Sequence, residues 1–207
     1  MAQTSTPEEP ARTRPNPRRR SERARKAILT AAGELLGEVG YNRLTMEAIA
    51  ARAKVGKQTI YRWWPAKSAV VLDVFAELTG GSAGEPLPDT GDLPADLRTV
   101  MHGIVDELAD PLMDRINRAV IAEMQADPEL AEHLTRTLLR PNLDAFGERL
   151  RAARDAGQID PGLDPAITVE LLLAPIQNRW MMRTGALSHA YVDTLIDTVM
   201  RALRPRD

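Results

Sequence analysis

Residues 45–67 read TMEAIAARAKVGKQTIYRWWPAK, and they predict two short helices joined by a tight turn. Thr45 can cap the first helix, whose apolar residues recur with helical spacing up to Ala53. Gly56 interrupts this pattern, and a second short helix is expected over residues 57–64. Two such helices, packed against a longer helix before them, form a helix-turn-helix unit. Its second short helix can enter the major groove of DNA, which is about 12 Å wide.

The side chains of this second helix have the chemistry that DNA recognition needs. Lys57 can reach guanine or phosphate, and Gln58 can pair with adenine through two hydrogen bonds. Thr59 and Tyr61 carry hydroxyl groups that suit phosphate oxygens, and Arg62 adds positive charge. We therefore expect all five residues to contact DNA.

The apolar residues of the same helix hold it in place. Ile60 and Trp64 are four residues apart, so they share one face and are expected to anchor the helix to its neighbours. For Trp63 two interpretations stay open: it packs against the following helix, or it lies against a sugar and a thymine methyl group.

The charge of the chain is divided unequally. Residues 1–64 hold 13 basic and 6 acidic side chains, whereas residues 65–207 hold 14 basic and 23 acidic ones. A cationic module joined to an anionic one indicates a polyanionic partner for the first module only. The alternative is a charged, solvated surface on which basic residues cluster by chance. Residues 12–26 strengthen the first interpretation, with eight basic side chains against the single acid Glu22.

Helical periodicity continues along the rest of the chain, and no segment has the alternation typical of a strand. Further helices are expected at residues 24–39, 66–78, 94–109, 111–126, 128–156, 165–184 and 189–203. Pro141 should kink or break the helix at 128–156, and residues 79–94 form the clearest loop. The expected fold class is all-α, with about nine helices.

The stretch quoted above resembles the DNA-binding signature of the tetracycline-repressor (TetR) family, and the resemblance covers residues of about 22–78. It rests on the threonine that opens the first short helix, the lysine, threonine and tyrosine at positions 57, 59 and 61, the aromatic residue at 64 and the proline and lysine at 65 and 67. The resemblance implies phosphate contacts from Thr45, Thr59, Tyr61 and Lys67, and base recognition by the exposed face of the helix.

Four positions depart from the family pattern. Lys54 stands where the family often has glycine, Gly56 where a capping serine is usual, and Ala66 where a serine commonly opens the next helix. Gln58 replaces a residue that is typically small, so the DNA sequence that is recognised is expected to differ.

The resemblance also implies an organisation for the whole chain. Residues 67–207 would be an effector-binding and dimerisation domain, with the helix at 66–78 as connector, and residues 21–66 the DNA-binding domain. Residues 1–20 are expected from their proline- and arginine-rich composition to be a flexible basic arm. The implied function is that of a dimeric, sequence-specific transcriptional regulator in the cytoplasm, associated with the nucleoid. It would be a repressor that a small-molecule effector releases from a palindromic operator in double-stranded DNA.

The last two helices are the expected homodimer interface. Both carry apolar stripes, and a helix that is apolar nearly all round needs cover on both sides, which a partner subunit can supply. The candidate interface residues are Leu172, Ile176, Val192, Leu195, Ile196 and Val199. The alternative is deep burial of these residues within one subunit.

An effector pocket is expected among the apolar and polar residues of the larger domain. The candidates are Met101, His102, Met113, Met124, Phe146, Gln177, Trp180 and Met181, with His102 or Gln177 as the polar group. Methionine adapts to varied ligands, but on a helix it can equally be part of the core.

Several other classes of function are set aside. The chain has no cysteine, its histidines lack metal-binding spacing, and no catalytic or phosphate-binding motif is present, so no cofactor, metal or enzyme activity is expected. Acidic residues such as Glu107 and Asp114 are expected to be solubilising. The longest apolar run, residues 171–176, is too short for a membrane. A ligand-independent architectural or replication-associated DNA-binding protein, and a helical enzyme or scaffold, remain as alternatives.

Overall fold

Helices account for the architecture, as the periodicity predicts. The structure is a computed structural model that describes residues 17–78 and 83–204, and these residues form ten α-helices, one π-helical segment and no strand. The all-α prediction is confirmed. None of the helices in this described part is long and apolar enough to cross a membrane.

The first three helices form the expected head: α1 (Pro17–Arg43), α2 (Met46–Arg52) and α3 (Lys57–Trp63). Gly40 interrupts α1 with a φ of 76°, which agrees with the expected end of the first helix at this glycine. Because α1 begins at Pro17, the last four residues of the predicted flexible arm are helical; the rest of that arm lies outside the described residues.

The other helices are α4 (Lys67–Leu78), α5 (Leu93–Ala109), α6 (Pro111–Ala126), α7 (Pro128–Leu134), α8 (Arg140–Asp155), α9 (Pro165–Met182) and α10 (His189–Ala202). Aspartate side chains accept hydrogen bonds from first-turn N–H groups of four of them, at Asp92, Asp110, Asp127 and Asp164. Each of these aspartates is followed by a proline within the first turn, where the missing N–H costs nothing.

The helix expected at 128–156 is divided, as Pro141 predicts. A π-helical segment, Thr135–Leu139, separates α7 from α8 directly before this proline. A proline lacks the N–H for the helical bond to the carbonyl four residues earlier, and its ring collides with that carbonyl. The wider π turn relieves this conflict.

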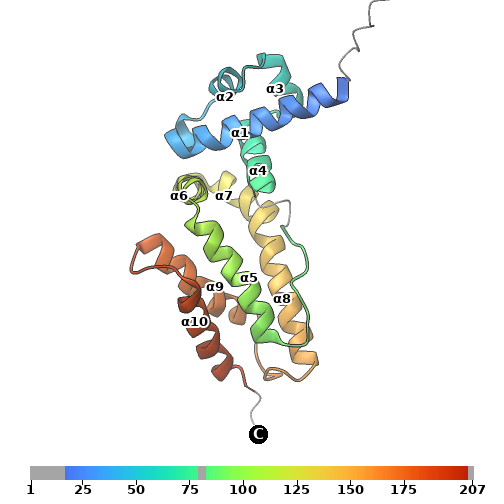
Figure 1. Cartoon of the computed structure of the whole chain (residues 1–207), viewed down its shortest axis with the longest axis vertical. Helices are drawn as coiled ribbons and strands as arrows, with labels where there is room; N and C mark the ends of the chain where they lie inside the picture. Colours follow the sequence, from blue (N-terminus) through green and yellow to red (C-terminus); the bar gives the residue numbers. More distant parts are fainter. Residues whose placement is uncertain (1–16, 79–82, 205–207) are drawn as a thin grey trace, which may run out of the picture.

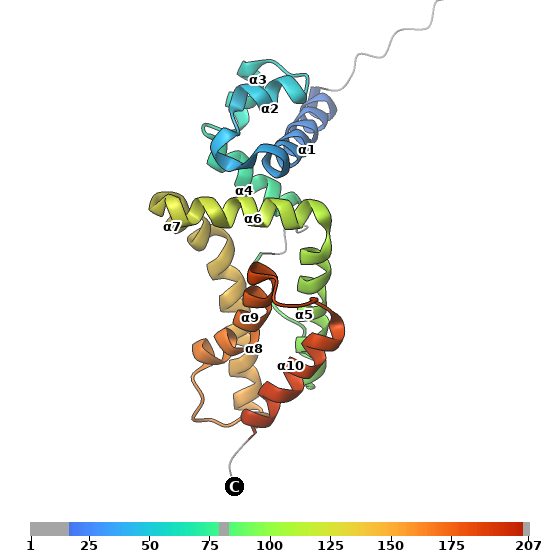
Figure 2. The same ribbon diagram turned by 90° about the vertical axis from the view of Figure 1, so that its left-hand side faces the viewer.

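Two hydrophobic cores hold the molecule together. The first core is formed by α1, α2, α3, α4, α6 and α7, and the second core is formed by α5, α8, α9 and α10. Figure 2 shows α6 lying across the molecule between the head and the remaining helices, and Figure 1 shows α4 descending from the head towards them. The first core therefore extends past the head, so that the head shares its packing with α4 and α6.

Candidate DNA-binding surface and ligand cavity

Helix α3 has an exposed polar face and a buried apolar face. Four of the side chains predicted to contact DNA are exposed on it: Lys57, Gln58, Tyr61 and Arg62. Thr59 is half-buried, whereas Ile60 and Trp64 are buried in the first core as expected. The helix thus has the division of faces that insertion into a DNA groove requires.

A shared carboxylate fixes the end of α3 to two other helices. The indole Nε1 of Trp64 donates a 3.0 Å hydrogen bond to Asp73 of α4. Arg25 of α1 donates to the same carboxylate oxygen, also at 3.0 Å. Trp63 packs partly buried against the first core, with its ring centroid 6.0 Å from that of Trp64. Its indole N–H has no hydrogen-bond partner in the described residues.

Two residues for which the family resemblance implies phosphate contacts have defined places, and one of them, Thr45, is the helix cap that the sequence predicts. Thr45 caps α2 by accepting a 3.1 Å hydrogen bond from the N–H of Ala48. Lys67, at the start of α4, donates a 3.0 Å bond to the carbonyl of Tyr41 and lies 4.2 Å from the centre of its ring. A lysine ammonium has three N–H groups, so this contact leaves donors for a phosphate.

Two lysines lie in and directly after the turn between α2 and α3, namely Lys54 and Lys57. The Lys57 Nζ atom lies 3.3 Å from the Glu47 carboxylate on α2, an ion pair between two exposed side chains. Lys54, in the turn itself, has a φ of 56°, in the left-handed region that favours glycine. This is the position at which the sequence departs from the family's usual glycine.

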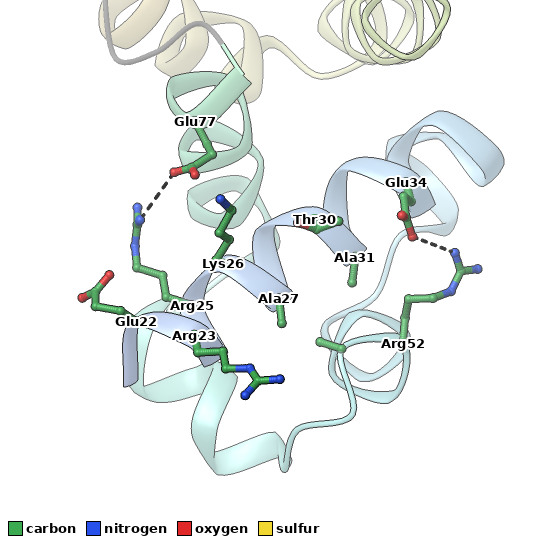
Figure 3. A pocket seen from close by; sticks show the side chains of 11 residues that line it. Glu22, Arg23, Arg25, Lys26, Ala27, Thr30, Ala31, Glu34, Arg52 and Glu77 are labelled. Carbon is green, nitrogen blue, oxygen red and sulfur yellow. Dashed lines mark ion pairs between the residues drawn. The ribbon is translucent and has the colours of Figure 1, made fainter. Parts of the chain in front are cut away.

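A groove on the head lies between α1 and the end of α2 (Figure 3). In it Arg52 lies 3.5 Å from Glu34, and Arg25 lies 3.7 Å from Glu77. Arg23 and Lys26 are exposed and pair with no acid among the described residues. These two cations are candidates for phosphate contact that sequence reasoning did not single out, although the basic run at 12–26 contains both.

Two adjoining cavities open between the helices of the larger part of the molecule, with volumes of about 610 and 450 Å³. Both are bordered by side chains of α5, α8 and α9, and the second also reaches α4 and α6. Residues shared by both walls are Ala83, Ile104, Glu107, Leu139, Asn142 and Gln177. The space is large enough for a drug-sized molecule.

The structure brings five of the eight predicted pocket residues to these cavities: Met124, Phe146, Gln177, Trp180 and Met181. The other three residues line neither cavity. Met101 is fully buried in the second core, and Met113 is buried in the first turn of α6. His102 binds Asp193 of α10 at 2.9 Å and stacks on His189, whose ring centroid is 4.1 Å away, so it fastens α5 to α10.

Glu107 is the cavity residue that sequence reasoning misjudged, because it was expected to be solubilising. Its side chain is partly buried, and burial raises the pKa of the carboxyl above its usual value. Asp114 is not merely solubilising either, since its Oδ1 atom accepts hydrogen bonds from Trp180 and Arg118 at 2.7 and 2.9 Å. Periodicity gave no signal for these roles.

The predicted dimer interface needs correction. Leu172, Ile176, Val192, Ile196 and Val199 are buried in the protomer's own second core, so they cannot reach a partner. Leu195 is only partly buried. The exposed face of α9 carries a different apolar set, with Ile167, Leu171 and Met181 at 53%, 51% and 46% exposure. Helix α9 is therefore apolar on both sides. The alternative interpretation, burial within one subunit, holds for the side that carries Leu172 and Ile176.

Comparisons with known proteins agree with this geometry. Residues 28–74 match the model of the bacterial regulatory proteins of the tetR family, and residues 87–199 match that of the tetracyclin repressor-like C-terminal domain. The uncharacterized HTH-type transcriptional regulator YdeS of Bacillus subtilis (strain 168) is 34% identical over 90% of this chain and 93% of its own length. The DNA-binding transcriptional repressor TetR of Mycobacteroides abscessus is 29% identical over 89% and 95%.

Solved structures give the same result. The TetR family transcription regulator SCO0332 superimposes with a TM-score of 0.69 and 31% identity, over 88% of this chain and 99% of that chain. SmeT, the repressor of the Stenotrophomonas maltophilia multidrug efflux pump SmeDEF, superimposes with a TM-score of 0.67 and 26% identity, over 86% and 89%. With its helix-turn-helix head, its helical body and these matches along both, the chain belongs to the TetR family of DNA-binding transcriptional regulators.

Proposed function

We propose that the chain is a homodimeric repressor, which a small-molecule effector releases from a palindromic DNA operator. The observation that carries the proposal is the position of the smaller of the two cavities, of about 450 Å³. Its walls include Phe75 of α4 and Val120 of α6, and both residues also belong to the first core, which the head shares. A ligand in the cavity therefore contacts the helices on which the head is mounted.

Close packing of α1 on these two helices supports transmission of such a contact. A Cβ atom at Gly33 would lie 3.4 Å from Val74 of α4, and one at Gly37 would lie 3.4 Å from Leu112 of α6. With so little space between the helices, a shift of α4 or α6 has to move α1 as well. The effector needs to favour the conformer that does not bind DNA by about 1–3 kcal/mol, which changes DNA affinity roughly 5- to 150-fold.

The exposed face of α9 supports the homodimer. Apolar or small side chains recur on it at positions 167, 171, 174 and 181, and exposed residues of α10 include Ala190, Thr194 and Thr198. On α9 these positions are four, three and seven residues apart, and on α10 they are four apart, so each set shares one helix face that suits packing against helices of a second copy. A two-fold dimer would place its recognition helices about one DNA turn, roughly 34–36 Å, apart.

Repression is favoured over the ligand-independent alternative by two observations. A chain that served only as an architectural DNA-binding protein would have no use for a cavity of this size. In addition, the Mycobacteroides abscessus relative and SmeT are both described as repressors.

The test is selection of bound duplexes from a random DNA pool, repeated at two salt concentrations. Enrichment of a palindrome is the expected result, and the operator obtained would locate the target genes. Gln58→Ala should change the enriched sequence, whereas Tyr61→Phe should weaken binding to all sequences alike because it removes a phosphate contact.

Two outcomes would contradict the proposal. Binding without enrichment, lost steeply as salt rises, would indicate a sequence-independent protein that binds phosphates only. An enriched operator that lacks two-fold symmetry would contradict recognition by a homodimer.

A further inference from the structure

The walls of the two cavities carry negative charge and no positive charge. Three glutamates line them, Glu85, Glu107 and Glu170, and no lysine, arginine or histidine is found among the described lining residues. Glu85 and Glu170 are exposed at the edge, whereas Glu107 is partly buried and borders both cavities. The charged side chains that line this space in the described part of the chain are therefore all carboxylates.

Glu107 differs from its neighbours on α5 in having no partner. Asp96 is paired with Arg149 at 2.7 Å, and Asp106 lies 2.8 Å from His189. No hydrogen bond or ion pair engages the Glu107 carboxylate among residues 17–78 and 83–204. A partly buried carboxylate without a partner is unfavourable for the folded protein, and a bound cation would remove that cost.

The rest of the wall suits an apolar or aromatic ligand. Phe75, Phe146 and Trp180 lie on it, and aromatic faces attract organic cations. The guanidinium of Arg118 already occupies one face of Trp180, 4.3 Å from its ring centre, so a ligand cation would rely on Phe75, Phe146 and the remaining face of Trp180. Asn117 adds a buried side-chain N–H group that has no partner in the described residues.

From this arrangement we propose that the cavity binds organic monocations with an apolar or aromatic body, and that the Glu107 carboxylate is their counter-ion. Protonated hydrophobic amines and quaternary ammonium or phosphonium ions belong to this class. The inference deepens the proposed function, on which it rests for the consequence of binding, since it names the chemistry of the effector.

The experiment compares two probes of nearly the same shape and opposite charge, tetraphenylphosphonium and tetraphenylborate. Binding of each to the full chain without DNA is measured by calorimetry. The cation should bind at least about tenfold more tightly than the anion, a difference of about 1.4 kcal/mol. Glu107→Gln keeps the size of the side chain and should reduce this preference at least tenfold, while Glu85→Gln, at the exposed edge, should change it less than threefold.

The wild-type preference needs no variant, so the test holds even if Glu107→Gln were to fold poorly. Equal binding of the two probes, preference for the anion, or no binding of the cation would overturn the inference. So would an unchanged preference in a folded Glu107→Gln chain. A different result would contradict the proposed function alone. In that case the cation would bind through Glu107, but saturating cation would leave the affinity for the selected operator unchanged.

Discussion

On the exposed face of α3, a neighbouring carboxylate competes for the lysine that is expected to read bases. The Glu47 carboxylate is 3.3 Å from Lys57 Nζ, and its pKa is lowered by its own backbone N–H group and by Lys57, so it stays ionised near neutral pH. DNA has to displace this acid, whose negative charge also repels phosphate. Glu47→Gln should therefore strengthen binding to the selected operator about two- to fivefold, the size of an exposed ion pair. Fluorescence anisotropy at fixed salt measures the change.

The control for this prediction is the same substitution in a Lys57→Ala background. If the ion pair is the cause, Glu47→Gln should gain clearly less there, because the lysine that it releases is absent. An equal gain in both backgrounds would assign the effect to overall charge and would contradict a specific restraint on Lys57.

Single residues also show where sequence reasoning is sufficient and where it is not. The exposed face of α3 was predictable, because chemical type and helical spacing assign Lys57, Gln58 and Tyr61 to one surface. The ion pair with Glu47 was not, because it depends on how α2 and α3 cross. The departure at Lys54 was visible in the sequence, but only the backbone gives its meaning: a side chain in the left-handed conformation costs about 1–2 kcal/mol.

Among the helices, α5 and α8 are joined by a buried ion pair. Asp96 and Arg149 are 2.7 Å apart with 2% of each side chain exposed, and Arg149 also holds the carbonyl of Pro88 in the preceding loop. Asp96→Asn removes the buried counter-charge and leaves the guanidinium with only the exposed Asp89 carboxylate, 3.3 Å away, which should lower the free energy of unfolding by about 3 kcal/mol, the lower end for a broken buried pair. Urea unfolding at neutral pH measures this loss. Asp155→Asn, at an exposed site on α8, is the control and should cost less than about 0.5 kcal/mol.

The same pair gives a pH dependence with a definite sign. Burial opposes ionisation of Asp96, but hydrogen bonds from Arg149 and Thr90 outweigh it, so the pKa of this carboxyl lies below its usual value. Its contribution to stability is complete above the unfolded pKa, about 3.9, and is lost as pH falls through the folded pKa. The stability difference between wild type and Asp96→Asn should accordingly shrink below about pH 4. A difference that stays constant down to pH 2 would contradict this role of the carboxylate.

Helix existence was predictable because long amphipathic patterns and Asp-Pro starts are local signals. The division of the helix expected at residues 128–156 was only partly predictable. Pro141 indicated a break, but the π turn over Thr135–Leu139 depends on how the chain accommodates the ring without losing its packing. The two short helices of the head were predictable for a different reason, since glycine and proline mark their ends.

In the whole molecule, the error in the predicted dimer interface arose because one helix has two apolar faces. Periodicity shows that α9 needs cover on both sides, but it does not tell which side the protomer itself covers. Leu172 and Ile176 meet α5, α8 and α10 in the second core, while Ile167 and Leu171 stay exposed. The adjacent acids of α5 differ in the same way, because Asp106 pairs with His189 and Glu107 borders the cavity. Such choices are made by tertiary packing and carry no local signal.

The corrected face of α9 leads to a test of the dimer. In a two-fold dimer, equivalent residues near the axis face each other, so Leu171→Glu would bring two carboxylates together and remove apolar contact. We expect the dimer to dissociate at least about tenfold more readily, seen by light scattering coupled to size exclusion. The protomer should keep its helical circular dichroism, because Leu171 is 51% exposed. Leu78→Glu is the matched control: it makes the same substitution at a site 41% exposed on α4 and should leave the dimer intact.

Val199→Glu should instead unfold the protomer, because Val199 is buried in the second core. A Leu171→Glu chain that remains a dimer, or a Val199→Glu chain that becomes a folded monomer, would return the interface to the inner face of these helices.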